Sequence, residues 1–154
     1  MPISNDQVQI NNIRTLSTYV MEKLYESEFV SHFVVKEESL LKSIWKGGTT
    51  TMNADQFTAE CKEQIHLFAA NNASKLYSDS RNFNYPISPE QQAWLDNELL
   101  PQLITAGIAK WALIYPEEFI AQLSVNQLLE EENSQSVNIR FFSSETEALQ
   151  WLHQ

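Results

Sequence analysis

The sequence is poor in the residues around which many functional sites are built. Its 154 residues include a single cysteine, Cys61, so no disulfide can form within the chain. Only three glycines are present, and two of them are adjacent at positions 47 and 48. The chain has no glycine-rich loop for phosphate, no G-x-S-x-G motif and no paired-carboxylate motif. We therefore expect a protein that is not an enzyme and carries no cofactor.

Long apolar runs and basic residues are also scarce. No stretch approaches the roughly 20 apolar residues that a membrane span requires, and the first residues lack the pattern of a signal peptide. We therefore expect a cytoplasmic protein without a membrane span. The formal net charge is −10, and from Asn82 onward ten acidic residues stand against only Lys110 and Arg140. Such a surface repels phosphate backbones, so we expect no binding to nucleic acid.

The histidines and the cysteine do not form a metal site. His32, His66 and His153 are far apart in the sequence and share no ligand spacing with Cys61 or with carboxylates. We expect no bound metal. Cys61 lies at a helical spacing from Phe57, which predicts a buried and unreactive thiol.

The first 22 residues have an ambiguous pattern. Apolar residues recur at spacings of three and four, as on one face of a helix. They are Ile10, Ile13, Leu16, Val20 and Leu24. Asn, Ser, Thr and Gln fill much of the remainder and compete with the helical backbone for hydrogen bonds. We interpret residues 1–22 as an N-terminal arm that could form a helix, and residues 23–154 as a single domain.

Strands and helices alternate after this arm. Two apolar runs at residues 28–36 and 40–47 predict a β-hairpin with two glutamates at its turn. Further short apolar runs predict strands at residues 76–79, 111–115 and 137–141. Helices are predicted around these strands, which gives the order α-β-α-β-α-β-α after the hairpin. This order is typical of an α/β fold, here with a mixed sheet of about five strands.

Capping patterns mark the starts of the predicted helices. Polar residues followed three positions later by Gln or Glu have the spacing of capping boxes. The pairs are Asn53 with Gln56, Ser88 with Gln91, Ser124 with Gln127 and Ser144 with Glu147. We expect the helix through Phe119 and Leu123 to restart at Ser124. Pro101 lies inside a helical pattern and cannot donate a hydrogen bond to Asn97, so we expect a kink there.

Five segments occur in this order: LKSIWKG at 41–47, LYSDSR at 76–81, WLDNE at 94–98, ALIYP at 112–116 and EALQWL at 147–152. Together they resemble the SpoIIAA-like members of the STAS group (sulfate transporter and anti-sigma-factor antagonist). The likeness covers residues 23–154. It implies sequentially wound β-α units, in a shape related to the CRAL-TRIO lipid-binding domain. It also implies either regulatory contact with another protein or the binding of an apolar small molecule.

The carboxyl end of the strand at residues 76–79 is the first candidate site. Asp79, Ser80 and Arg81 lie there, where open α/β sheets tend to bind ligands. Alternatively, Asp79 caps backbone amides and Arg81 pairs with a carboxylate in an ordinary loop. In the anti-sigma antagonists, an Asp-Ser pair is followed by a small hydroxyl residue and a glycine. Here Arg81 and Asn82 follow Ser80, so we predict that Ser80 is not a regulatory phosphosite.

Three tryptophans form a second candidate site. Trp45, Trp94 and Trp111 lie at element ends or in a strand and could line an apolar pocket. The alternative is ordinary core packing. Three glutamates at 130–132 lie where a helix should end, and are either a solvated helix end or an acidic edge that meets a basic partner.

These observations favour a non-catalytic regulatory module that binds another protein, with a binding protein for a small apolar ligand or lipid as the alternative. Right-handed crossovers place most helices on one face of the sheet. Residues 111–115 are apolar at every position and carry apolar groups to both faces. Residues 1–22 could cover the other face within the chain or on a neighbour, so we expect a homodimer or an arm packed across the sheet.

Overall fold

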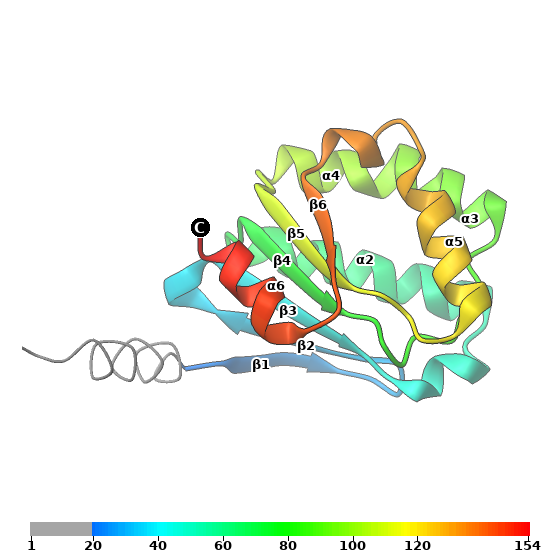
Figure 1. Cartoon of the computed structure of the whole chain (residues 1–154), viewed down its shortest axis with the longest axis horizontal. Coiled ribbons are helices and arrows are strands. Elements are labelled where there is room, and N and C mark those ends of the chain that lie inside the picture. Colours follow the sequence, from blue (N-terminus) through cyan, green and yellow to red (C-terminus); the bar gives the residue numbers. More distant parts are fainter. Residues whose placement is uncertain (1–19) are drawn as a thin grey trace, which may run out of the picture.

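The computed structural model describes residues 20–154, which are built around a six-stranded mixed sheet (Figure 1). The strands are β1 (Glu22–Glu26), β2 (Val30–Val35), β3 (Leu40–Trp45), β4 (Lys75–Asp79), β5 (Lys110–Ile114) and β6 (Ile139–Phe142). They lie side by side in sequence order; β1 to β3 pair antiparallel, and β3 to β6 pair parallel. The predicted mixed α/β sheet with an N-terminal hairpin is confirmed, with six strands instead of about five.

The additional strand is β1, at one edge of the sheet. Leu24, which the helical spacing placed on a helix face, lies in this strand. The register against β2 shifts between Lys23 and Tyr25, so a bulge interrupts the alternation of side chains. A short, charged and bulged edge strand shows no period of two, which is why the sequence pattern did not reveal it. The rest of the predicted arm, residues 1–19, lies outside the described residues.

The helices begin largely where the sequence predicted. They are α2 (Ala54–Ala70), α3 (Pro89–Trp94), α4 (Leu100–Thr105), α5 (Phe119–Leu129) and α6 (Glu145–Leu152). Both hydrogen bonds of the capping box form between Asn53 and Gln56, and again between Ser88 and Gln91. Among residues 20–154, no helix combines the length and the apolar character that a bilayer crossing needs.

The irregularity expected at Pro101 takes the form of a widened turn. A π-helix, Leu95–Leu99, joins α3 to α4, and the Leu100 N–H donates to the carbonyl of Leu95. Pro101 follows directly and has no N–H to donate to Asn97. The chain therefore carries one residue more in this turn than an α-helix would.

The expected restart at Ser124 is wrong, because α5 runs unbroken. Its cap is Glu118, whose carboxylate accepts hydrogen bonds from first-turn N–H groups, including that of Ala121. Ser124 is buried, and its hydroxyl donates to the Ala121 carbonyl while accepting from the Ile87 N–H. Ser124 therefore ties α5 to the loop before α3 instead of starting a helix.

The helices cover the two faces of the sheet unequally. The larger core cluster joins one face to α2, α3, α4, α5 and the π-helix. On the opposite face α6 packs over β4, β5 and β6 (Figure 1). Trp151 of α6 belongs there to a smaller core cluster with Tyr77 and Ala112. The expectation that most helices share one face is confirmed. On the face that α6 occupies, Val35 of β2 and Leu40 of β3 belong to the cluster around α6, and Lys42 pairs with Glu145 of α6. Phe33 and Ile44, farther along the same two strands, do not belong to that cluster.

His32 is fully buried where β2 faces α2. Its Nδ1 atom lies 2.8 Å from the hydroxyl of Ser43, which also accepts a hydrogen bond from Gln64. Within residues 20–154, the Nε2 atom of His32 has no hydrogen-bond partner. Burial lowers the pKa of His32 to about 4, so the imidazole is neutral at neutral pH.

We predict that this burial makes stability fall as the pH drops from about 6.5 to about 4. In this window the unfolded chain binds a proton at His32 and the folded chain does not, so protonation favours unfolding by up to about 3 kcal/mol. Urea unfolding at several pH values, on wild type and H32N, measures the effect. H32N should flatten the pH dependence, whereas H66N, which changes an exposed histidine of α2, should retain it. An unchanged slope in H32N would contradict the prediction.

Candidate functional site

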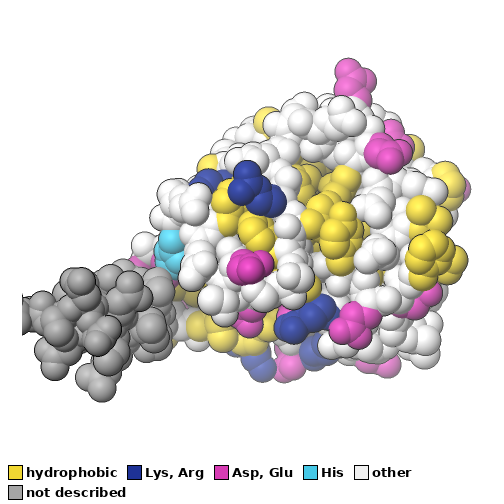
Figure 2. All heavy atoms as spheres, viewed as in Figure 1, with side chains coloured by type: hydrophobic (Ala, Val, Ile, Leu, Met, Phe, Trp, Pro, Cys, Tyr) yellow, Lys and Arg dark blue, Asp and Glu magenta, His cyan; other side chains and the backbone are white. Residues whose placement is uncertain are grey.

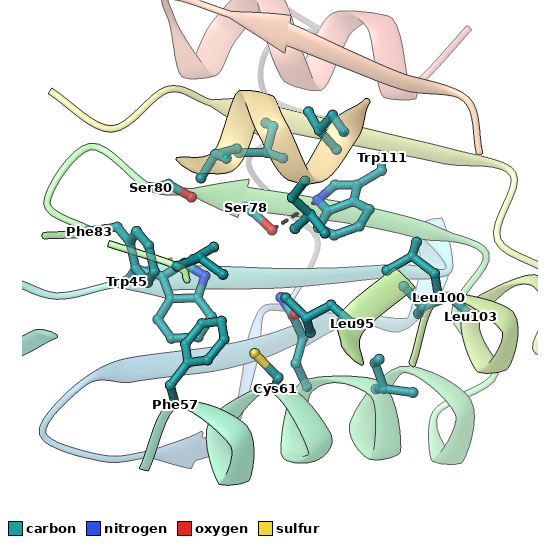
Figure 3. Close-up of a pocket in the computed structure, with 17 residues that line it drawn as sticks. Trp45, Phe57, Cys61, Ser78, Ser80, Phe83, Leu95, Leu100, Leu103 and Trp111 are labelled. Atoms are coloured by element: carbon teal, nitrogen blue, oxygen red, sulfur yellow. Dashed lines mark hydrogen bonds between the residues drawn. The ribbon is translucent and has the colours of Figure 1, made fainter. Parts of the chain in front are cut away.

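A cavity lies inside the larger core, between the sheet and helices α2 to α5 (Figure 3). Its volume is about 80 Å³. Trp45 and Trp111 enter its wall from β3 and β5, and Phe57 enters from α2. Leu95 of the π-helix and Leu103 of α4 line the opposite side (Figure 3). The walls are therefore mainly apolar, and the widened turn forms part of them.

A few polar side chains reach this wall. The indole N–H of Trp111 donates to the hydroxyl of Ser78 at 3.0 Å, as drawn in Figure 3. Gln64 donates to the hydroxyl of Ser43 at 3.0 Å. Ser80 also lines the cavity, and no hydrogen bond of its hydroxyl is found among the described residues. Ser80 can thus offer a hydrogen bond to a polar atom inside the cavity.

Asp79 ends β4 and Arg81 lies just after it, on the other side of the sheet from the cavity. The Arg81 guanidinium donates to both carboxylate oxygens of Asp79, from Nε at 3.0 Å and from Nη2 at 2.6 Å. Burial acts to raise the pKa of Asp79, but the hydrogen bonds and charge of Arg81 outweigh it and hold that pKa below its ordinary value. Asp79 and Arg81 thus form a bidentate ion pair with each other. This agrees with the alternative interpretation of the loop, in which Arg81 pairs with a carboxylate.

An open groove lies at the carboxyl ends of β5 and β6. Its volume is about 470 Å³, and Arg81 stands at its edge. Tyr115 and Phe141 stack in it with ring centroids 3.7 Å apart, beside Pro116 and Phe142. The space-filling view shows apolar side chains in the hollow between α6 and α5 (Figure 2). The groove can accept an apolar group from outside the molecule.

The structure divides the predicted site residues among three places. Trp45, Trp111 and Ser80 come together at the cavity. Asp79 and Arg81 form the ion pair beside the groove. Trp94 lines neither the cavity nor the groove. It is half-buried on α3, where the ammonium of Lys62 lies 5.9 Å from its ring centroid. Ser80 is only 5% exposed, so a kinase would have to reach a buried hydroxyl. That Ser80 is not a regulatory phosphosite stays a prediction.

Sequence reasoning missed an exposed apolar surface on α5. Phe119, Ile120 and Leu123 are 69%, 51% and 43% exposed, and we call these three residues the α5 surface. The opposite side of the same helix, which includes Ala121 and Val125, is buried against the core. Apolar side chains appear at the corresponding place in Figure 2. The sequence could have revealed this surface, because apolar residues occur on both sides of the helix. A helix with one buried face needs apolar residues on that face alone.

Titratable groups give no support to catalysis at the cavity. Cys61 lines it, and burial raises the pKa of its thiol, so the predicted buried cysteine is confirmed and its thiolate is disfavoured. In the part of the chain that the structure describes, no three residues among His, Cys, Asp and Glu are grouped as metal ligands. The cavity and the groove both offer apolar side chains to a ligand.

Comparisons with models of known protein families, with curated proteins and with solved structures give no match.

Proposed function

We propose that the protein is a non-catalytic regulatory module of the STAS type, which acts by binding another protein at the α5 surface. The observation that supports this proposal is the exposure of Phe119, Ile120 and Leu123 within five consecutive residues. Single exposed apolar residues are common on protein surfaces, whereas a contiguous group marks a contact site. The groove between α5 and β6 adds apolar area beside the helix.

Burial of the α5 surface would supply a useful share of a binding free energy. Covering a Phe or Leu side chain contributes roughly 1.5–3 kcal/mol, so two such residues account for tenfold changes in affinity or more. Ile104 on α4 is 43% exposed, as Leu123 is. It therefore provides a matched control for the loss of an exposed apolar side chain.

We predict that the double change F119S and L123S abolishes capture of the specific partner, because it removes the apolar contact and leaves the net charge unchanged. Tagged wild type, the double variant and I104S are used to enrich proteins from an extract of the native cells, with quantification by mass spectrometry. The partner is a protein enriched by wild type and I104S and depleted about tenfold or more by the double variant. Equal recovery by all three forms would contradict the proposal.

A second candidate function is the binding of a small apolar molecule in the cavity. Its support is the wall, in which two tryptophans and one free serine hydroxyl surround an apolar space. A volume of about 80 Å³ is roughly half that of an engineered cavity of about 150 Å³ that binds benzene. The ligand of this candidate is therefore smaller than benzene, such as a short alkyl group, and a larger lipid would require the helices to move apart.

Filling the cavity tests this candidate. Xenon under pressure, a small apolar probe of such cavities, should raise the melting temperature of wild type by about 3 °C at saturating concentration, because it binds only the folded state. The change S80L places a leucine at the cavity wall and should remove this shift. S136L, at an exposed serine, is the matched control and should retain it. Absence of a shift in wild type, or the same shift in S80L, would contradict ligand binding in the cavity.

We also propose that the full chain forms a homodimer through the part of the sheet face around Phe33 and Ile44 that α6 leaves uncovered. Phe33 and Ile44 alternate with His32 and Ser43, so their side chains lie on that face, and both are only half-buried. The arm predicted at residues 1–22, of which residues 1–19 lie outside the described residues, would complete this contact, within the chain or across the dimer.

Light scattering on the full chain and on residues 20–154 tests the homodimer. The shorter chain keeps β1 intact, whereas removal of 22 residues would cut into it. We predict that the full chain has the mass of a dimer, and that the shorter chain aggregates or loses stability because apolar area is uncovered. If the full chain and the shorter chain are both monomers of equal stability, the arm covers no apolar area and the proposal is wrong.

A further inference from the structure

The α5 surface has a charge environment that specifies what it can bind. Resting on the proposed function, we infer that its occupant is an amphipathic helical segment of another protein, with apolar side chains on one side and lysines or arginines beside them. The inference stands on the spacing of the apolar residues, on the acidic residues around them and on the position of every basic residue after Asn82.

The apolar residues have the spacing of a helix-binding ridge. Phe119 and Leu123 are four residues apart on α5, and Ile120 and Leu123 are three apart, so each pair lies on adjacent turns. Side chains at these spacings interdigitate with the i, i+3 and i+4 residues of a second helix. Phe119 lies three residues before Gln122, which lines the groove. The ridge therefore continues toward the groove on one side.

The charged residues at the two ends of this ridge are acidic. Glu117 and Glu118 are exposed before the first turn, and Glu130 is exposed just after the last. Glu130 follows Leu123 by seven residues, or about two turns, so it lies on the same side of the helix. An apolar ridge between carboxylates is complementary to apolar anchors flanked by ammonium or guanidinium groups.

The basic residues of this half of the chain lie elsewhere. Beyond Asn82 the only ones are Lys110 and Arg140. Both charged groups lie 5.1 Å from the ring centroid of Trp151, which packs on the opposite face of the sheet from α5. Arg81 lines the groove together with Glu117, but its guanidinium is paired with the carboxylate of Asp79. No cation from residues 82–154 neutralises the carboxylates at the ends of α5.

The same charges argue against other occupants of the ridge. A second copy of α5 would bring Glu117 and Glu130 against their own counterparts, and like charges at close range cost affinity. An anionic membrane surface or a nucleic acid would meet the same repulsion. A basic amphipathic segment gains both from the apolar ridge and from its acidic ends.

Fluorescence anisotropy with a labelled amphipathic peptide of leucine and lysine tests the inference. We expect binding to the full-length protein that weakens about tenfold or more in the double variant F119S and L123S, and is retained in I104S. The double variant has the same net charge as wild type, so its loss of binding separates the ridge from general attraction to an acidic protein. The analogous peptide of leucine and glutamate should not bind.

Paired charge variants locate the acidic contribution. The double change E117Q and E130Q should lower the affinity for the leucine-lysine peptide about threefold to tenfold. Raising the salt concentration from about 50 to about 500 mM should lower it by a similar factor. E28Q with E37Q changes the net charge equally at exposed positions of the β2 region and should have little effect. Equal losses in both pairs, or tight binding of the leucine-glutamate peptide, would overturn the inference.

The peptide result and the partner result can be told apart. If the peptide binds independently of Phe119 and Leu123 while a cellular protein still requires them, the protein-binding function stands and the basic class of partner is wrong. If neither depends on these residues, both proposals fail. Sedimentation of wild type and the double variant identifies the remaining case, because a dimer lost in the double variant would make a second copy the occupant.

Discussion

Burial of strand β4 on both faces is the constraint on which most of the structure depends. Leu76 and Ser78 face the layer of α2 to α5, Tyr77 faces α6, and all three are at most 2% exposed. A strand of this kind needs apolar elements on each side. Parallel pairing with β3 and β5 forces crossover connections, which supply those elements. Ala112 on β5 is also fully buried, and its small side chain leaves room for α6.

Buried polar groups hold the walls of the cavity in position. Asp96, on the π-helix, is 2% exposed and accepts hydrogen bonds from the backbone N–H groups of Asn133 and Ser134. It thereby ties the π-helix to the segment between α5 and β6. Ser124 makes a second tie, from α5 to the loop before α3. Because these contacts satisfy buried groups, the surrounding helices cannot collapse into the cavity without leaving them unpaired.

Local chemistry was readable from the sequence, and tertiary context was not. The capping boxes at Asn53 and Ser88 and the buried positions of Cys61 and Phe57 depend on neighbours a few residues away, and the structure confirms them. Strand β1 depends on pairing with β2, which its own charged sequence does not reveal. The predicted restart of the helix at Ser124 is wrong, because the Ser124 hydroxyl accepts a buried hydrogen bond from the distant Ile87 N–H and does not cap a helix. Which aromatic residues share a cavity depends on the packing of four elements, and no local pattern encodes it.

The widened turn at Leu95–Leu99 makes this part of the chain sensitive to length. It holds one residue more than a regular helix, in the pattern of a single inserted residue. Deleting one residue there would let the backbone close into a continuous α-helix. Five residues of the wide turn and four residues of an α-helical turn both complete about one turn, so α3 and α4 would keep their orientation and Leu100 and Leu103 would still face the cavity. The residues within the turn would shift, Leu95 and Asp96 among them, and this would change the wall of the cavity and the hydrogen bond from Ser134. Homologous chains of this fold that lack the extra residue would therefore differ in this wall while keeping the helices on either side of it.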